Sequence, residues 1–166
     1  MNRHVVSALV ENRSGVLSRV SGLFSRRGFN IDGLTVGETE NPSVSRMTIA
    51  VTGDEQVLDQ IIKQLGKLVD VIAVRELDPA SCIRRELMLI KVKADESVRP
   101  AVIEIASIFR SRIVDVSPST ITIEATGDSE KLEGLLLLLR TYGIIELART
   151  GLVAVERGSS ILNITI

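Results

Sequence analysis

One stretch of seven residues recurs in the chain with two changes, and it decides the fold. Residues 48–54 read TIAVTGD, and residues 122–128, which lie 74 positions later, read TIEATGD. Each copy predicts a β-strand, a Gly-Asp turn, and a helix whose first amide groups the Asp caps. The apolar register continues into both expected helices at Leu58, Leu65, Leu132 and Leu139. The chain is therefore expected to contain two similar units.

Apolar periodicity extends this pattern over the first half of the chain. A strand at residues 4–10 is followed by a turn and by a helix at residues 16–27. Gly28 is expected to end that helix, because glycine adopts a left-handed conformation at little steric cost. Two strands, a helix and a last strand are expected at residues 31–38, 44–51, 57–68 and 69–76. The order is βαββαβ, that of a ferredoxin-like unit.

The second half repeats the same order. Its strands are expected at residues 86–93, 112–116 and 120–126 and within 144–155, and its helices at residues 99–110 and 132–140. We therefore predict the α+β class with two ferredoxin-like domains. The expected divisions are a first domain at 1–77, a linker at 78–83, a second domain at 84–158 and a tail at 159–166.

Composition and charge exclude several classes of protein. Of 166 residues, 45% are hydrophobic and 25% charged, which is enough apolar material for a core. A net charge of −1 offers no field for nucleic acid or an anionic membrane. The single Cys82 cannot form an intramolecular disulfide, which favours a reducing compartment. With a polar start and no long apolar run, the chain is expected to be soluble and cytoplasmic.

An enzyme would need a nucleophile, a base or a metal cluster, and the chain offers few of these groups. It has one histidine, His4, and Cys82 has no histidine near it in sequence. No phosphate-binding loop or dinucleotide-binding glycine pattern occurs. We therefore predict no catalytic residues, no bound metal and no cofactor in this chain, although catalysis by carboxylates alone stays open.

The RNA recognition motif shares the βαββαβ order but stacks bases on aromatic residues of its first and third strands. Here the corresponding strands, at residues 4–10 and 44–51, contain no aromatic residue. Arg26 and Arg27 are simpler to interpret as a solvated helix end. Binding of nucleic acid is therefore not expected.

The turn at residues 11–18 carries the strongest functional signal. It leads into the first helix, whose free amide groups favour a carboxylate ligand. Gly15 leaves room for a ligand near the backbone, and Asn12 offers both donors and an acceptor. The apolar wall of such a pocket would come from Val16, Leu17, Ile31 and Leu34. The competing interpretation is structural: Asn12 or Ser14 caps the helix and Gly15 is a turn glycine.

The same turn lies in a run that resembles a known family. Residues 9–31 are similar to the ACT domain of the small regulatory subunit of acetolactate synthase. Further similar motifs are Ser45-Arg46-Met47-Thr48, Lys67-Leu68-Val69-Asp70-Val71, Arg85-Glu86-Leu87, Ile113-Val114-Asp115-Val116 and Ala148-Arg149-Thr150-Gly151. The resemblance extends to about residue 158, and the tail resembles nothing known. Asp32-Gly33 stands where the family often has Glu-Ser, which could alter the strand edge.

The resemblance implies a regulatory protein with an ACT domain followed by an ACT-like domain. Such subunits bind a large catalytic subunit that uses thiamine diphosphate, Mg²⁺ and FAD to condense two pyruvates, or pyruvate and 2-oxobutyrate. They raise its activity and confer feedback inhibition by valine or a related branched-chain amino acid. The effector residues implied by the resemblance are Asn12, Gly15, Val16, Leu17, Asn30 and Ile31.

The second strand is expected at a sheet edge, where unpaired backbone groups invite a partner strand. We therefore expect a homodimer in which Asn30 and Ile31 of one chain complete the pocket at residues 12–17 of the other. Two alternatives stay open: a free-standing amino-acid sensor that acts on another protein, and an enzyme in its own right.

Overall fold

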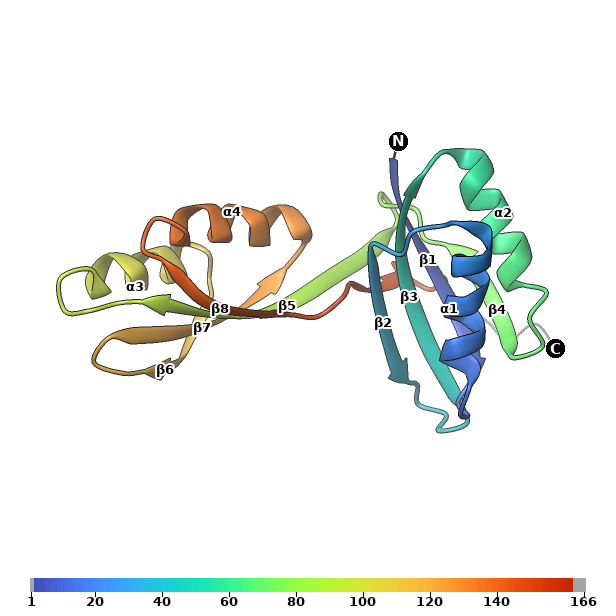
Figure 1. The fold of residues 1–166 in the computed structure, drawn as a ribbon, viewed down its shortest axis with the longest axis horizontal. Helices are drawn as coiled ribbons and strands as arrows, with labels where there is room; N and C mark the ends of the chain where they lie inside the picture. The colour runs from blue at the N-terminus through green and yellow to red at the C-terminus, as the bar shows by residue number, and fades with distance from the viewer. Residues whose placement is uncertain (1, 163–166) are drawn as a thin grey trace. The chain divides into compact units, whose positions relative to one another are not determined.

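A computed structural model describes residues 2–162, which form two compact units. Residues 2–83 and 151–162 belong to the first unit, and residues 84–150 to the second. Within each unit, two helices cover one face of an antiparallel sheet (Figure 1). Among these residues no helix is long and apolar enough to cross a membrane.

The first unit confirms the predicted βαββαβ order. Its sheet has the strand order β2-β3-β1-β4, so β2 lies at an edge as expected. The α1 helix covers the predicted residues and ends at Gly28, whose φ of 69° is left-handed. The elements are β1 (Asn2–Glu11), α1 (Val16–Arg27), β2 (Gly33–Glu38), β3 (Val44–Gly53), α2 (Glu55–Leu65) and β4 (Val71–Glu76).

The second unit repeats this order, with the strand order β6-β7-β5-β8. Its elements are β5 (Cys82–Lys93), α3 (Arg99–Ile108), β6 (Arg112–Val116), β7 (Thr120–Gly127), α4 (Ser129–Leu139) and β8 (Ile144–Arg149). A further short strand, β9 (Val153–Glu156), pairs with β5. The sequence did not separate β8 from β9.

The repeated Gly-Asp turn acts as predicted in both units. Asp54 accepts a hydrogen bond of 2.9 Å from the amide of Val57, and Asp128 accepts one of 2.9 Å from the amide of Lys131. Each Asp therefore satisfies an orphan donor in the first turn of its helix. The matched leucines Leu58, Leu65, Leu132 and Leu139 are all buried.

The first sheet is buried on both faces, which the predicted domain boundary did not anticipate. All residues of β1 from His4 to Val10 are buried, although only alternate ones face the helices. On the opposite face, Val5 packs into a small cluster that includes Leu152 and Ala154. The C-terminal segment at residues 151–162 therefore covers the outer face of the first sheet, whereas the sequence placed residues 151–158 in the second domain.

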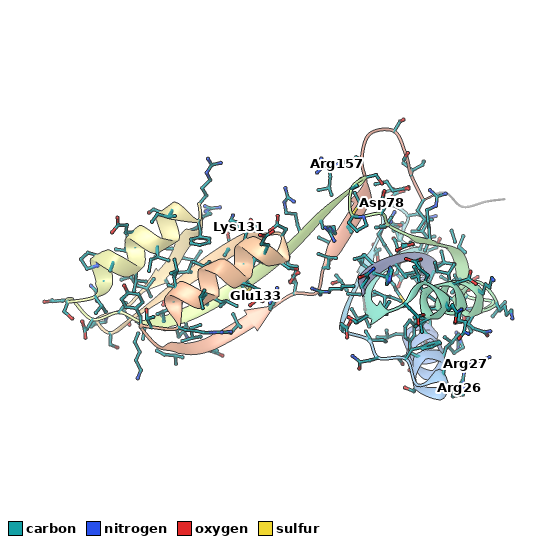
Figure 2. All side chains as sticks on the ribbon, turned by 90° about the horizontal axis from the view of Figure 1, so that it is seen from above. Arg26, Arg27, Asp78, Lys131, Glu133 and Arg157 are labelled. Atoms are coloured by element: carbon teal, nitrogen blue, oxygen red, sulfur yellow. The ribbon has the colours of Figure 1, made fainter. Side chains whose placement is uncertain are left out.

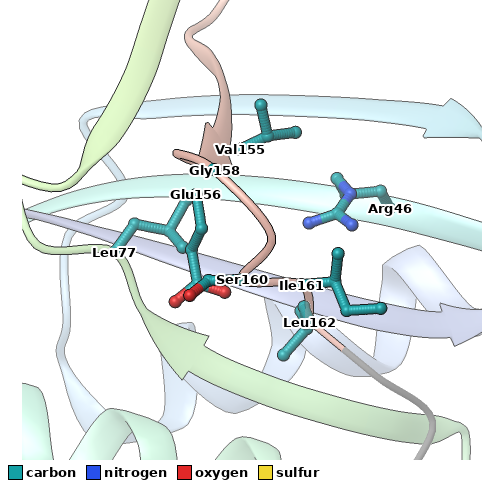
Figure 3. A pocket seen from close by; sticks show the side chains of 8 residues that line it. All are labelled: Arg46, Leu77, Val155, Glu156, Gly158, Ser160, Ile161 and Leu162. Atoms are coloured by element: carbon teal, nitrogen blue, oxygen red, sulfur yellow. The ribbon is translucent and has the colours of Figure 1, made fainter.

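A small cavity lies between this segment and the sheet (Figure 3). It measures about 150 Å³ and is lined by Arg46, Leu77, Val155, Glu156, Gly158, Ser160, Ile161 and Leu162. Part of the predicted tail thus contributes to the first unit, while residues 163–166 lie outside the described residues. The largely apolar stretch at residues 5–10, interrupted only by Ser7, was the available signal, because such a stretch is typical of a strand buried on both faces.

The residues considered above for catalysis or nucleic-acid binding lie in the core or at a solvated helix end. His4 is buried and its Nδ1 lies 2.9 Å from Oε1 of Glu76, while Cys82 is a buried free cysteine. Arg26 and Arg27 are exposed in the last turn of α1, as expected for a solvated helix end (Figure 2).

Candidate functional site

The turn between β1 and α1 ends in a backbone conformation that only glycine adopts without strain. Gly15 is the N-cap of α1, with φ 85° and ψ −13°, and no side chain of the described residues caps the helix. The interpretation of Asn12 or Ser14 as the cap is therefore wrong. The first amide groups of α1 are left for water or a ligand, and the positive end of the helix dipole favours an anion there.

Asn12 links this turn to the turn between β2 and β3. Its Nδ2 donates to the carbonyl oxygen of Pro42 at 2.8 Å and to Oε2 of Glu38 at 3.2 Å. Both donors of the side chain are therefore engaged within the chain, and the carbonyl oxygen is left as the group that can bind a ligand ammonium. The sequence predicted that donors and acceptor would both serve the ligand.

A buried carboxylate lies beside the turn and holds two arginines. Asp70 is 1% exposed, and its Oδ1 accepts from Nη2 of Arg13 at 2.6 Å. Its Oδ2 accepts from Nε of Arg19 at 2.5 Å. The hydrogen bonds from Arg19 and Arg13 hold the pKa of Asp70 below its ordinary value. The carboxylate is therefore ionised at neutral pH and fixes both guanidinium groups near the start of α1.

Arg19 also closes the side of the turn. A β-carbon added to Gly15 would lie 3.1 Å from Nη1 of Arg19, so the guanidinium packs against the glycine. Asp70, Arg13 and Arg19 were not among the site residues predicted from the sequence. The signal was a charged residue inside the apolar run Val69-Asp70-Val71, since buried carboxylates are rare unless they are paired.

The predicted apolar wall is only partly available to a ligand. Val16 is 3% exposed and belongs to the core, so it can offer a ligand its amide but not its side chain. Leu17 is 46% exposed beside the free amide groups. Ile31 and Leu34 are partly buried against the same core. Leu17 is therefore the most accessible apolar side chain of the predicted set.

Asn30 and Ile31 lie at the opposite end of α1 from Gly15. They precede β2, which begins at Gly33, so the predicted start of this strand at Ile31 is two residues too early. Nδ2 of Asn30 donates to Oδ1 of Asp32 at 2.7 Å, which turns the chain into the strand. Twelve helical residues span roughly 18 Å, so one chain does not bring these two residues to the turn at residues 12–17.

Comparison with known proteins identifies the family. A profile described as "AHAS small subunit-like ACT domain" matches residues 6–73, and a profile described as "Small subunit of acetolactate synthase" matches residues 85–158. Together they span both units. The chain belongs to the acetolactate synthase small-subunit family. All six predicted effector residues fall within the ACT-domain match.

Relatives of this family match over nearly the whole chain. A protein of Methanothermobacter thermautotrophicus named "Probable acetolactate synthase small subunit" is 59% identical, over 94% of this chain and 94% of its own length. The acetolactate synthase isozyme 3 small subunit of Salmonella typhimurium is 49% identical, over 96% and 99%. The crystal structure of the acetolactate synthase small subunit from Thermotoga maritima superimposes with a TM-score of 0.90 at 44% identity, covering 96% of this chain and 100% of that one.

Proposed function

We propose that this chain binds the large catalytic subunit of acetolactate synthase, raises its activity, and makes it sensitive to feedback inhibition by valine or a related branched-chain amino acid. The observation that carries the effector site is the uncapped start of α1. Its free amide groups receive the carboxylate of the amino acid, directly after Gly15, whose left-handed conformation ends the turn. The carbonyl oxygen of Asn12 receives the ammonium, and Leu17 contacts the aliphatic side chain.

We further propose that the pocket is completed by a second copy of the chain. The edge strand β2 has unpaired backbone groups on one side. If two β2 strands pair in antiparallel register, the residues before Gly33 of one copy lie beside Glu38 of the other. Glu38 contacts Asn12 in its own chain. This pairing therefore carries Asn30 and Ile31 of one copy toward the turn at residues 12–17 of the other.

In this proposal the chemistry takes place on the large subunit. Thiamine diphosphate, Mg²⁺ and FAD are bound there, and the small subunit contributes regulation in the cytoplasm. The residues described above bind and orient an effector, and none of them is assigned a step of the reaction.

The proposal is tested by calorimetric titration of valine, leucine and isoleucine against the isolated protein and by reconstitution with the large subunit. We expect one amino acid to bind with the highest affinity and to inhibit the reconstituted enzyme. A dimer is expected by light scattering at micromolar concentration. Failure to retain the large subunit in a pull-down, with amino-acid binding intact, would favour a free-standing sensor. Pyruvate turnover by the isolated chain would instead favour an enzyme.

A further inference from the structure

The two units build the same corner of their fold with the same backbone hydrogen bonds. In the first unit the amide of Asn12 donates to the carbonyl of Ser43 at 2.8 Å. In the second unit the amide of Ala94 donates to the carbonyl of Ser119, also at 2.8 Å. The turn after β5 therefore corresponds to the candidate effector turn after β1.

A second pair of hydrogen bonds extends this correspondence. The amide of Glu11 donates to the carbonyl of Asp70 at 2.9 Å, and the amide of Lys93 donates to the carbonyl of Gly143 at 3.0 Å. Lys93 thus replaces Glu11, and Gly143 replaces Asp70. At this corner the second unit has a lysine where the first unit has an acidic residue, and a glycine where the first unit has the buried carboxylate.

These replacements leave the corner of the second unit open. In the first unit Asp70 and its two arginines lie at this corner. In the second unit a cavity of about 670 Å³ lies at this corner; it is wide open to solvent, and most of its lining residues are exposed. It is lined by Lys93, Asp95, Val98, Ser119, Thr120, Thr141, Tyr142 and Ile145.

The cavity carries both signs of charge. Lys93 lies along Gly143, since a β-carbon added to that glycine would be 3.3 Å from Cδ of the lysine. Lys91 on the same strand pairs with Glu146 at 3.4 Å, whereas Lys93 forms no salt bridge within residues 2–162. The Lys93 ammonium is therefore available to a ligand carboxylate, with the hydroxyl groups of the lining as further donors.

Asp95 supplies the negative group. Its Oδ1 accepts from the hydroxyl of Ser97 at 2.5 Å, from the amide of Ser97 at 2.9 Å and from the amide of Val98 at 3.3 Å. All three bonds end on one oxygen, which leaves Oδ2 available to a ligand ammonium. The ring of Tyr142, with Val98 and Ile145, provides an apolar wall.

We propose that this cavity is a second amino-acid site, which binds a zwitterionic α-amino acid with a large apolar side chain. Lys93 binds the carboxylate, Asp95 binds the ammonium, and the side chain packs on Tyr142. The opposite charges of Lys93 and Asp95 favour a zwitterion. A further positive group lies nearby in Arg99, which donates to the carbonyl oxygens of Ala94, Ser117 and Pro118. The site is independent of the proposed effector pocket at Gly15, because every lining residue belongs to the second unit.

The composition of the chain supplies a selective probe. Tyr142 is the single tyrosine and there is no tryptophan, so tyrosine fluorescence reports on the surroundings of this one residue, which lines the cavity and packs against the core of the second unit. Titration of the full-length protein with L-leucine should change this fluorescence saturably. We expect no saturable change with 4-methylpentanoate, which lacks the ammonium, or with isopentylamine, which lacks the carboxylate. An equal response to either compound would overturn the zwitterion assignment.

Three variants separate this site from the first unit. Lys93→Met retains the aliphatic cover of Gly143 and should weaken leucine binding by about tenfold or more, as expected when a charged hydrogen bond is lost. The matched control Lys91→Met, on the same strand outside the cavity, should bind like the unmodified protein. Gly15→Asp should leave the Tyr142 response intact. The proposal is overturned if Tyr142 does not respond to leucine, if both lysine variants bind equally, or if Gly15→Asp abolishes the response.

Discussion

Replacing Gly15 by Asp places a carboxylate where the ligand carboxylate is expected to bind. The glycine has a φ of 85°, so any other residue there is strained by about 1–2 kcal/mol. The new β-carbon would lie 3.1 Å from Nη1 of Arg19, so the end of this flexible side chain must shift slightly to make room for it. We therefore expect a folded protein whose stability falls only modestly.

The effect on valine binding should be larger than the effect on stability. Two like charges about 4 Å apart repel by on the order of 1–4 kcal/mol in a partly solvated site. Since about 1.4 kcal/mol changes an affinity tenfold, valine binding should weaken by one to three orders of magnitude. Activation of the large subunit should largely survive, because effector binding and subunit contact are proposed to be separable.

Gly15→Ala is the matched control for this prediction. It introduces the same backbone strain and the same β-carbon, but no charge. Valine affinity from calorimetry, melting temperature and activation of the large subunit should be measured for both variants. If a folded Gly15→Asp protein binds valine like Gly15→Ala, the carboxylate does not bind at the start of α1 and the site has been misplaced.

Three further changes test other parts of the structure. Asn12→Ala should weaken valine binding by roughly tenfold, because a hydrogen bond to a charged group is lost. Calorimetry should therefore give a lower valine affinity per folded molecule than for the unmodified protein. Because folding lowers the pKa of Asp70, this group stabilises the fold at pH values above its ordinary pKa of 3.8. That contribution is lost as the pH falls through the pKa of the folded protein. Denaturant unfolding of Asp70→Asn at several acidic pH values should therefore show a weaker pH dependence than the unmodified protein. Gly151→Ala places a β-carbon against Oγ1 of Thr35 and 2.7 Å from the carbonyl oxygen of Leu34, and it should lower stability by about 1–3 kcal/mol. Gly37→Ala, whose β-carbon meets nothing within 4 Å, should cost much less in the same assay.

Local chemistry made much of the fold predictable. Gly28 ends α1 and Asp54 caps α2 through contacts within a few residues, so their roles can be inferred from sequence spacing. The repeat of the same Gly-Asp turn at Asp128 then indicated two similar units. These signals depend on backbone geometry that neighbouring residues determine among themselves.

The parts that were missed depend on contacts between distant residues. Asp70 binds Arg13 and Arg19, which are 57 and 51 positions away, and no local pattern links the three. The segment at residues 151–162 covers the first sheet because the second unit is inserted between β4 and this segment. Sequence order therefore suggested that residues 151–158 belong to the second domain, although they pack on the first. The apolar stretch of β1 indicated only that both faces of the first sheet are covered, and not which segment covers them.

The charge balance around α1 identifies which groups can attract an effector. Arg13 pairs with Glu11 at 2.7 Å as well as with Asp70, and Arg19 pairs with Asp70. Two positive groups therefore face two negative ones, and their net field on an incoming carboxylate is small. The uncapped amide groups after Gly15 supply the uncompensated positive potential. Asp70 holds Arg13 and Arg19 beside this turn, so we expect substitutions of these residues to alter affinity through the shape of the turn rather than through direct contact with the amino acid.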